Sequence, residues 1–382
     1  MSVLKLYDYF PIEVEKGRGN YIYSKEGNKY LDTFSGIGVH ALGHRNHKIT
    51  DIFIDKIKRH SHLSNFFLDE NAEPVARKLT NYTDSEGKVF FTNSGTESIE
   101  GIIKIIQKES PSDKNLLVNF QKGFHGRTTG ALAINGFDHL KAPFQPLLPN
   151  TVELPLNNVA KLENFMEEKG EKVAALFLEP VQGSGGIRLL DNDFAKAIND
   201  LKEEYGFILV SDEIQAGLGR TGKNFSYQWY ELKPDLIAVA KSLGCGLPLG
   251  AILMLNRYQN SFQPGEHGST FAPNPIALAG ANHLLDRIPE LLSNVLEQGN
   301  LLKNMLKKLD NELIQNVRGK GLMVGIQLKG EYPELRNIGL EHKILLNVLR
   351  DRIIRLLPPL NISEEQIEEI VDKIEKVLCS LR

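Results

Sequence analysis

Two patterns of hydrophobic and polar residues alternate along the middle of this chain. Short apolar runs predict buried strands, and apolar residues three or four positions apart predict amphipathic helices between them. Strands that alternate with helices indicate an α/β fold, with helices on both faces of a mostly parallel sheet. The predicted strands cover residues 88–91, 116–120, 173–178, 207–210, 236–240 and 251–255, and the predicted helices lie near 47–60, 99–106, 159–168 and 193–205.

The two ends of the chain are organised differently. Near the start, 21–23 and 30–31 predict short strands; after residue 285, helical patterns near 290–309 and 335–350 flank strands at 322–328 and 353–357. Residues 362–367 carry a capping box and a hydrophobic staple, which open a last helix. We therefore expect a large domain over 46–285, and a small α/β domain formed jointly by 1–45 and 286–382.

Composition narrows the class of protein. The chain has 382 residues, of which 41% are hydrophobic and 24% charged, and 45 Lys and Arg against 48 Asp and Glu give a net charge of −3. These values are typical of a globular protein and predict no basic surface for nucleic acid or for an anionic membrane. No apolar run reaches the roughly 18 residues of a spanning helix, and the N-terminus lacks a signal-peptide pattern.

Cysteine and histidine usage adds to this. The two cysteines are too few for a disulfide framework. The histidines between residues 40 and 62 match no metal-ligand spacing, so we expect no metal. The sequence therefore predicts a cytoplasmic protein that binds neither nucleic acid nor membranes.

The strongest chemical signal lies where the apolar run 236–240 stops. Lys241 follows this run directly, and a glycine-rich turn comes next. Ligands of α/β sheets bind beyond the carboxyl ends of the strands, so a lysine there could form a Schiff base. A lysine that merely leaves the core to reach water would give the same local pattern. The residues at the other strand ends decide between the two interpretations.

Those strand ends are also polar. The clusters are residues 123–128, 179–183 and 211–215. Functional groups gathered at carboxyl strand ends indicate a catalytic crevice. After the strand 88–91, Ser94 and Glu97 predict a capping box, and such a helix start can bind phosphate or can simply be capped.

One motif invites a wrong interpretation. Residues 217–222 fit G-x-G-x-x-G, the pattern of dinucleotide-binding folds. In those folds the glycines come directly at the strand end and open a helix, whereas here residues 212–216 intervene and no amphipathic helix follows. We reject the dinucleotide interpretation.

A strand-end lysine, a strand-end aspartate, a hydroxyl-rich helix start and an aromatic residue are the groups that pyridoxal phosphate needs. The lysine binds the aldehyde and later acts as a base, while the carboxylate keeps the ring nitrogen protonated. From the residues alone, the prediction is a cofactor enzyme with a reactive lysine.

Six segments, in order over nearly the whole chain, resemble the class III (ornithine-type) aminotransferases of pyridoxal-phosphate fold type I. Two further segments, 35–44 and 317–323, look most like the acetylornithine/succinylornithine branch of that family. The six segments are Asn93–Glu97, Phe124–Thr128, Glu179–Gly183, Asp212–Gly222, Ala240–Gly244 and Arg355–Leu360.

The resemblance implies roles for individual residues. Lys241 would carry the cofactor and Asp212 would pair with its ring nitrogen, and these two are the implied catalytic residues. Thr270 would reach the phosphate from a partner subunit, which implies a homodimer with shared active sites. The other implied cofactor-binding residues are Ser94, Gly95 and Thr96 at the phosphate, Phe124 on the ring face, His125, and Gln215 near the ring hydroxyl.

Two arginines would bind the substrates. By resemblance, Arg127 takes the α-carboxylate of the amino donor, and Arg355 takes that of glutamate and 2-oxoglutarate. The planar fork of arginine suits both roles because it can bind a carboxylate through two parallel hydrogen bonds.

The chain departs from the family pattern at several positions. Ser184 stands where the family usually has a glutamate that masks the Arg355-type arginine while an ω-amino donor is bound. Without that glutamate, Arg355 should stay unmasked. Ile99, Cys245 and the pair Ala272-Pro273 also replace family residues, and the last two changes lie near the expected cofactor.

The implied activity is transfer of the terminal amino group of N-acetylornithine to 2-oxoglutarate, giving a semialdehyde and glutamate in arginine biosynthesis. N-succinylornithine, a carrier-bound lysine-pathway intermediate and 4-aminobutyrate are alternative donors. Glutamate-1-semialdehyde aminomutase shares the fold but would need no added 2-oxoglutarate. A non-catalytic paralogue is the third hypothesis, and the intact Lys241 and Asp212 argue against it.

Overall fold

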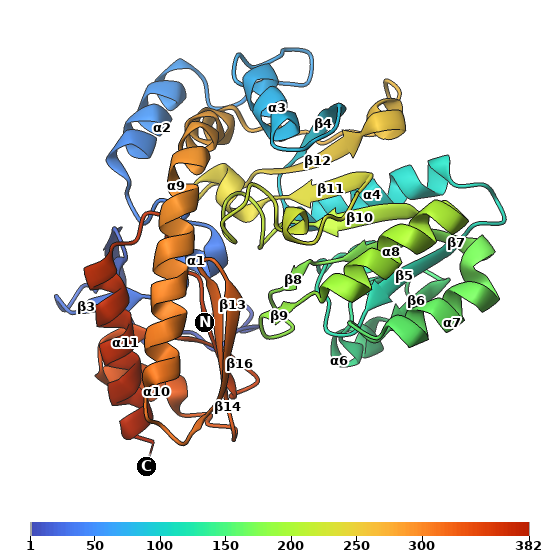
Figure 1. The fold of residues 1–382 in the computed structure, drawn as a ribbon. Coiled ribbons are helices and arrows are strands. Elements are labelled where there is room, and N and C mark those ends of the chain that lie inside the picture. Colours follow the sequence, from blue (N-terminus) through green and yellow to red (C-terminus); the bar gives the residue numbers. More distant parts are fainter. Residues whose placement is uncertain (1, 382) are drawn as a thin grey trace.

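A mixed sheet of seven strands forms the centre of the molecule (Figure 1). The computed structural model describes residues 2–381. The strand order is β4-β12-β11-β10-β7-β5-β6, and only β12 runs against its neighbours, so the predicted mostly parallel sheet is confirmed. The strands are β4 (Gly87–Thr92), β5 (Leu116–Phe120), β6 (Thr151–Leu154), β7 (Val173–Leu178), β10 (Ile208–Asp212), β11 (Leu236–Val239) and β12 (Gly250–Leu255).

Helices cover both faces of this sheet. Figure 1 shows α4 (Gly95–Glu109) behind the sheet and α7 (Val159–Lys169) and α8 (Asn192–Tyr205) in front of it. The side chains of β10 alternate accordingly: Leu209 belongs to the buried cluster that contains Phe194 of α8, whereas Ile208 and Val210 belong to the cluster that contains Ile102 of α4. Burial on both faces explains why these strands are continuous apolar runs.

The first and last parts of the chain lie together. β15 (Ile344–Leu345) pairs in parallel with β3 (Lys29–Asp32) and completes a sheet with β1 (Val14–Arg18) and β2 (Tyr21–Ser24). A second small sheet has the order β13-β14-β17-β16. The proposed domain boundaries near 45 and 285 stay a prediction. The strands of the second sheet are β13 (Ile314–Lys320), β14 (Met323–Leu328), β17 (Ile353–Leu356) and β16 (Asn347–Leu349).

The remaining elements connect these layers. The elements are α1 (Ser35–Gly38), α2 (His47–Arg59), α3 (Ala72–Asn81), α5 (Thr129–Ala133), α6 (Asp138–Lys141), β8 (Val181–Gln182), β9 (Arg188–Leu189), α9 (Pro275–Lys308), α10 (Leu335–Glu341) and α11 (Glu364–Cys379). Among the described residues, no helix combines the length and apolar character needed to cross a membrane.

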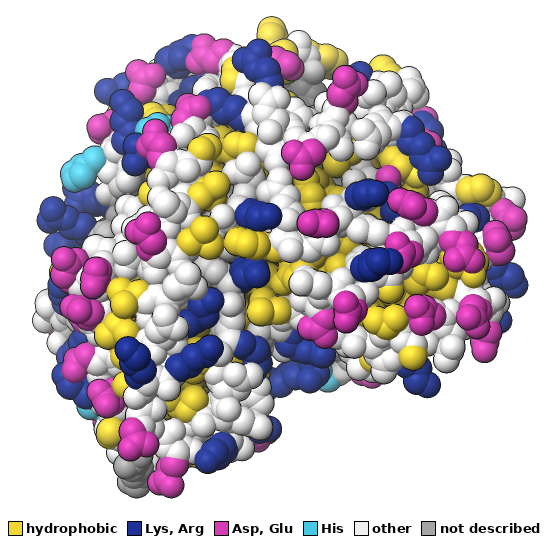
Figure 2. Space-filling view, in the orientation of Figure 1, with side chains coloured by type: hydrophobic (Ala, Val, Ile, Leu, Met, Phe, Trp, Pro, Cys, Tyr) yellow, Lys and Arg dark blue, Asp and Glu magenta, His cyan; other side chains and the backbone are white. Residues whose placement is uncertain are grey.

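Figure 2 shows basic and acidic side chains interspersed over one face, and a notch between the region of β13 to β16 and the large sheet.

Three predictions about local structure were wrong in detail. The stretch 335–350 is not one helix: α10 ends at Glu341, and β15 and β16 follow because the chain pairs with β3 and β17, which are distant in sequence. The helix expected near 290–309 begins at Pro275 and contains Pro289. At the start of α4, Glu97 accepts a hydrogen bond from the backbone of Asn93 (2.7 Å), so the predicted reciprocal bond to Ser94 is absent.

Candidate active site

The carboxyl ends of the parallel strands converge on a cavity of about 470 Å³. Since β11, β10 and β7 are parallel neighbours, Lys241, Asp212 and Glu179 meet at one edge of the sheet. Most of the predicted site residues line this cavity together. They are Ser94, Gly95, Thr96, Phe124, His125, Arg127, Asp212, Gln215 and Lys241.

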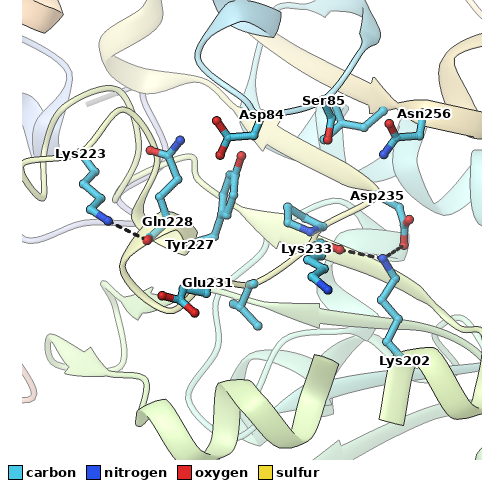
Figure 3. A pocket seen from close by; sticks show the side chains of 13 residues that line it. Asp84, Ser85, Lys202, Lys223, Tyr227, Gln228, Glu231, Lys233, Asp235 and Asn256 are labelled. Atoms are coloured by element: carbon cyan, nitrogen blue, oxygen red, sulfur yellow. Dashed lines mark hydrogen bonds and ion pairs between the residues drawn. The ribbon is translucent and has the colours of Figure 1, made fainter. Parts of the chain in front are cut away.

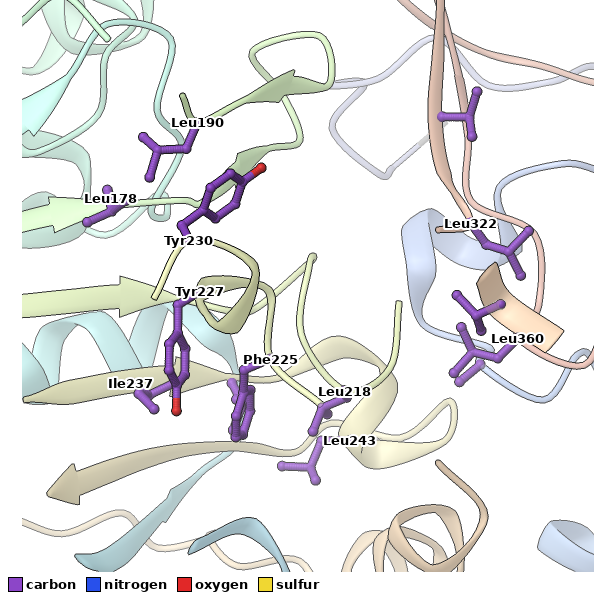
Figure 4. Close-up of a cluster of buried hydrophobic side chains, with 14 of the residues drawn as sticks. Leu178, Leu190, Leu218, Phe225, Tyr227, Tyr230, Ile237, Leu243, Leu322 and Leu360 are labelled. Atoms are coloured by element: carbon purple, nitrogen blue, oxygen red, sulfur yellow. The ribbon is translucent and has the colours of Figure 1, made fainter. Parts of the chain in front are cut away.

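Lys241 is held at the cavity wall by an anchored turn. It has a left-handed backbone (φ 48°) and opens a 3₁₀ turn, Lys241–Gly244, directly after the fully buried β11. Leu243 of this turn is buried in the cluster that also holds Leu218 and Ile237 (Figure 4). The core therefore fixes the turn, and Lys241 faces the cavity instead of extending to outside water.

The surroundings of Lys241 favour its neutral amine. Burial lowers the pKa of Lys241 to about 8, with a smaller contribution from the positive charge of Arg355, while Asp212 and Glu179 oppose the shift. A neutral amine is a nucleophile and a base, whereas an ammonium group is neither. Near neutral pH, a larger fraction of Lys241 is therefore neutral than of an ordinary lysine.

Asp212 is oriented by a histidine. Nδ1 of His125 lies 2.8 Å from Oδ2 of Asp212, both side chains are buried, and Oδ1 of Asp212 accepts a hydrogen bond from the backbone of Ile214 (3.0 Å). Burial disfavours the charged form of His125, but the hydrogen bond and charge of Asp212 outweigh it and raise the pKa of His125. These hydrogen bonds fix the carboxyl group of Asp212 at the cavity wall.

The N-terminal end of α4 offers an anion site. Ser94 is the N-cap and accepts a hydrogen bond from the backbone of Glu97 (3.3 Å). The backbone N–H groups of Gly95 and Thr96 have no hydrogen-bond acceptor among residues 2–381. Free N–H groups at the positive end of a helix dipole bind phosphate well.

Glu179 is a site residue to which the sequence interpretation assigned no role. Its two carboxylate oxygens accept hydrogen bonds from the backbone N–H groups of Phe124 (2.8 Å) and Gly183 (3.0 Å). One buried side chain thereby fixes the loops that carry Phe124 and Ser184. Its position at the end of the predicted strand 173–178 was the available signal.

Arg127 and Phe124 lie beside each other at the cavity. The guanidinium carbon of Arg127 is 5.5 Å from the ring centre of Phe124, a cation–π distance. The backbone N–H of Arg127 donates to Oγ1 of Thr96 (3.3 Å). Contact with the helix start therefore places this arginine at the same end of the cavity as the anion site.

The structure does not bring every predicted residue to the cavity wall. Arg355 lies behind Gln215, to whose Oε1 its Nη1 donates (3.1 Å), whereas Ser184 lines the cavity itself. Thr270 is exposed, and within this single chain it does not line the cavity. It lies beside Ser269, which accepts a hydrogen bond from Asn93 (2.9 Å).

Figure 3 shows a second hollow. Its volume is about 730 Å³, and none of the predicted site residues lines it. Two lysines that line this hollow already have partners: Lys202 pairs with Asp235 (2.9 Å), and Lys223 donates to the backbone of Gln228 (2.8 Å). The cavity at Lys241 is therefore the candidate active site.

The rejected dinucleotide motif is structural. Gly219 and Gly222 adopt positive φ angles (85° and 89°), and the segment forms turns that open no helix of the dinucleotide-binding kind. Between them, the buried Arg220 donates to the backbone carbonyls of Leu322 (3.2 Å) and Pro358. Arg220 thus joins this segment to the residues that flank β14 and β17 of the second small sheet.

Comparisons with known proteins cover the whole length of the chain. Residues 4–378 match the family Aminotransferase class-III. The chain is 38% identical to an acetylornithine aminotransferase of Aquifex aeolicus over 97% of this chain and 98% of that protein. It is 39% identical to an acetylornithine aminotransferase of Bacillus cereus over 99% and 97%, respectively. An ornithine aminotransferase structure from Toxoplasma gondii, described with partial occupancy of pyridoxal phosphate, superposes with a TM-score of 0.92 at 26% identity, covering 99% of this chain and 92% of that one.

The residues present in the cavity fit pyridoxal 5'-phosphate, the cofactor of this family. The free N–H groups of α4 suit its phosphate, and Asp212 suits its ring nitrogen. Glycine lets the loops of this cavity pack closely against their neighbours: a Cβ at Gly95 would lie 2.6 Å from Ile214, and one at Gly126 would lie 2.3 Å from Thr96. Sequence, fold and site chemistry agree, and the chain belongs to the class III aminotransferases.

Proposed function

We propose that this protein transfers the terminal amino group of N-acetylornithine to 2-oxoglutarate. The observation that carries this proposal is the near full-length similarity, at 38% and 39% identity, to two proteins named acetylornithine aminotransferase. Two arginines support it, because both substrates carry an α-carboxylate: Arg127 lines the cavity, and Arg355 contacts Gln215 of the cavity wall. N-succinylornithine, a lysine-pathway intermediate and 4-aminobutyrate are the alternative donors.

The cofactor would be held by residues of three strand ends. Ser94, Gly95 and Thr96 would bind the phosphate, and Phe124 would cover the ring. Asp212, kept in place by His125, would hold a proton on the ring nitrogen. When bound, pyridoxal phosphate supplies an aldehyde carbon that takes up amino groups and a ring that withdraws electrons.

Lys241 would move the proton. Its neutral Nζ, favoured by burial, takes the proton from the substrate carbon that bears the amino group and returns a proton at the position where the product needs it. Both half-reactions use the same site, so the kinetics should be ping-pong.

The arginines would select the substrates. Arg127, near the cavity mouth, would bind the α-carboxylate of the donor, and Arg355 would bind the α-carboxylate of 2-oxoglutarate. Ser184 lines the cavity where the family usually has a masking glutamate. A serine carries no charge, so Arg355 would remain available through both half-reactions.

A homodimer would complete the site. Thr270 would reach the phosphate of the partner subunit, since it does not reach the cavity of its own chain. Apolar side chains near this loop support the proposal, because large exposed apolar groups mark interaction surfaces. They are Phe66 (95% exposed), Phe67 (68%), Leu68 (80%) and Phe271 (67%).

An absorbance scan of the purified protein tests the donor. We expect N-acetylornithine to bleach the near-visible band of the bound cofactor, and 2-oxoglutarate to restore it. Lys241→Ala is the control and should show neither change. If only another amine bleaches the band, the donor assignment is wrong; if the reaction runs without added 2-oxoglutarate, an aminomutase is favoured.

A further inference from the structure

Arg355 is a buried cation without an anionic partner. Its side chain is 4% exposed, and no carboxylate of residues 2–381 lies within ion-pairing distance of it. Burial lowers the pKa of Arg355 to about 10, although the negative charge of Glu179 opposes this shift. Burying an uncompensated charge is unfavourable unless a ligand supplies the opposite charge.

Two neutral amide oxygens hold the guanidinium instead. Nε of Arg355 donates to Oδ1 of Asn347 (2.8 Å), and Nη1 donates to Oε1 of Gln215 (3.1 Å). Asn347 lies directly opposite Arg355 in the antiparallel pair of β16 and β17, so both side chains emerge on the same face of the sheet. The partner on the other side, Gly325 of β14, has no side chain to compete for the arginine.

Some N–H donors of the Arg355 guanidinium have no hydrogen-bond partner in the described part of the chain. A guanidinium has five N–H donors, one on Nε and two on each terminal nitrogen. Asn347 occupies the donor on Nε, which closes the edge formed by Nε and Nη2. Nη2 makes no hydrogen bond to any described residue. Gln215 takes one of the two N–H groups on Nη1, so the other N–H on Nη1 and both on Nη2 have no partner among residues 2–381 and are free to bind a ligand.

We propose that Asn347 is a positioning residue that fixes Arg355 so that the substrate carboxylate binds across its two terminal nitrogens. This inference rests on the proposed role of Arg355 in binding 2-oxoglutarate. A neutral amide suits the task because it orients the guanidinium without neutralising it. An aspartate at the same place would form an ion pair and compete with the substrate.

Binding of glutarate to the holoenzyme tests the proposal. Glutarate has the two carboxylates of 2-oxoglutarate but no keto group, so its binding can be measured by calorimetry without turnover. Asn347→Leu removes the acceptor at similar volume, and we expect glutarate to bind about tenfold more weakly, the usual effect of losing one hydrogen bond to a charged group. Asn347→Asp should also weaken binding and should reduce its dependence on salt.

Gln327→Leu is the matched control. Gln327 lies in the same sheet and accepts a hydrogen bond from another arginine, Arg318 (2.5 Å), away from the cavity. We expect this variant to bind glutarate like the wild type. In turnover assays, Asn347→Leu should raise KM for the keto acid and leave KM for the amino donor unchanged, a split that general loosening of the sheet would not produce.

Three results would contradict the proposal, and they differ in what else they overturn. If Asn347→Leu binds glutarate as tightly as the wild type while Arg355→Leu does not, only the role of Asn347 is wrong. If Arg355→Leu also binds like the wild type, the role of Arg355 within the proposed function is wrong as well. Equal losses in Asn347→Leu and Gln327→Leu would likewise overturn the positioning role.

Discussion

At the scale of single residues, the reactivity of Lys241 depends on its burial. A lysine with a pKa of about 8 is roughly one-tenth neutral at pH 7, compared with less than one-thousandth for an ordinary lysine. The neutral fraction rises with pH, reaches one half at the pKa and approaches its maximum only above the pKa. We expect the rate at which the apoprotein takes up pyridoxal phosphate to rise with pH and to reach half of its maximum near pH 8.

Stopped-flow absorbance from pH 6 to 9.5 measures this uptake, with the free cofactor and N-acetyl-lysine amide as the reference reaction. The reference should still be rising at the upper end of that range. A protein profile that parallels the reference would show that burial leaves the amine of Lys241 unperturbed, and the interpretation of the site chemistry would then need revision.

At the scale of elements, one buried carboxylate fixes the loop that follows β10. Glu213 accepts hydrogen bonds from the backbone N–H groups of Ser226 and Tyr227 (both 2.8 Å) and from the hydroxyl groups of Ser226 (2.8 Å) and Ser211 (3.1 Å). It thereby ties the short 3₁₀ helix Ser226–Trp229 to the strand that ends in Asp212.

We expect Glu213→Ala to lower the free energy of unfolding by about 3 kcal/mol, because two buried backbone donors lose their acceptor. Glu203→Ala is the control: Glu203 forms an exposed ion pair with Lys233 (3.3 Å), and such pairs contribute little. Urea denaturation of both variants measures the difference. Equal stability of the two variants would contradict the role assigned to Glu213.

At the scale of the whole molecule, the dimer proposal assigns the exposed apolar group of Phe66, Phe67, Leu68 and Phe271 to the interface between subunits. The ring of Phe271 also lies 5.7 Å from that of His62, so the two loops that carry this group are adjacent. If the protein is a dimer through this surface, charged residues there should separate the subunits and remove Thr270 from the partner's site.

We expect the double variant Phe67→Glu, Leu68→Glu to sediment as a monomer and to lose its cofactor on dialysis at least tenfold faster than the wild type. Phe144→Glu introduces the same charge at another exposed aromatic residue (60% exposed) and should leave the mass unchanged. Analytical ultracentrifugation decides. A wild-type protein that sediments as a monomer would refute the dimer proposal.

The strands and helices of the large sheet could be predicted along the chain because burial of a strand on both faces requires a continuous run of apolar residues. The run 236–240 is apolar throughout because β11 is fully buried, and Lys241 marks where the strand reaches the cavity. The N-terminal boundary of α4 could be predicted for the same kind of reason, since a cap acts within one turn. The stretch 335–350 was wrongly predicted as one helix because the spacing of its apolar residues suits a helix. In the structure, β15 instead pairs with β3, which lies over 300 residues earlier in the chain.

The sequence by itself determined which residue types stand at the strand ends, and therefore that Lys241, Asp212 and the start of α4 would share a crevice. Only the tertiary structure decided how these groups are held. His125 and Asp212 are 87 positions apart, Glu179 and Phe124 are 55 apart, and Asn347 reaches Arg355 from the neighbouring strand. The spacing of hydrophobic residues depends only on neighbours within one helical turn or one strand. Hydrogen bonds between distant segments therefore cannot be predicted from this spacing and require the folded structure.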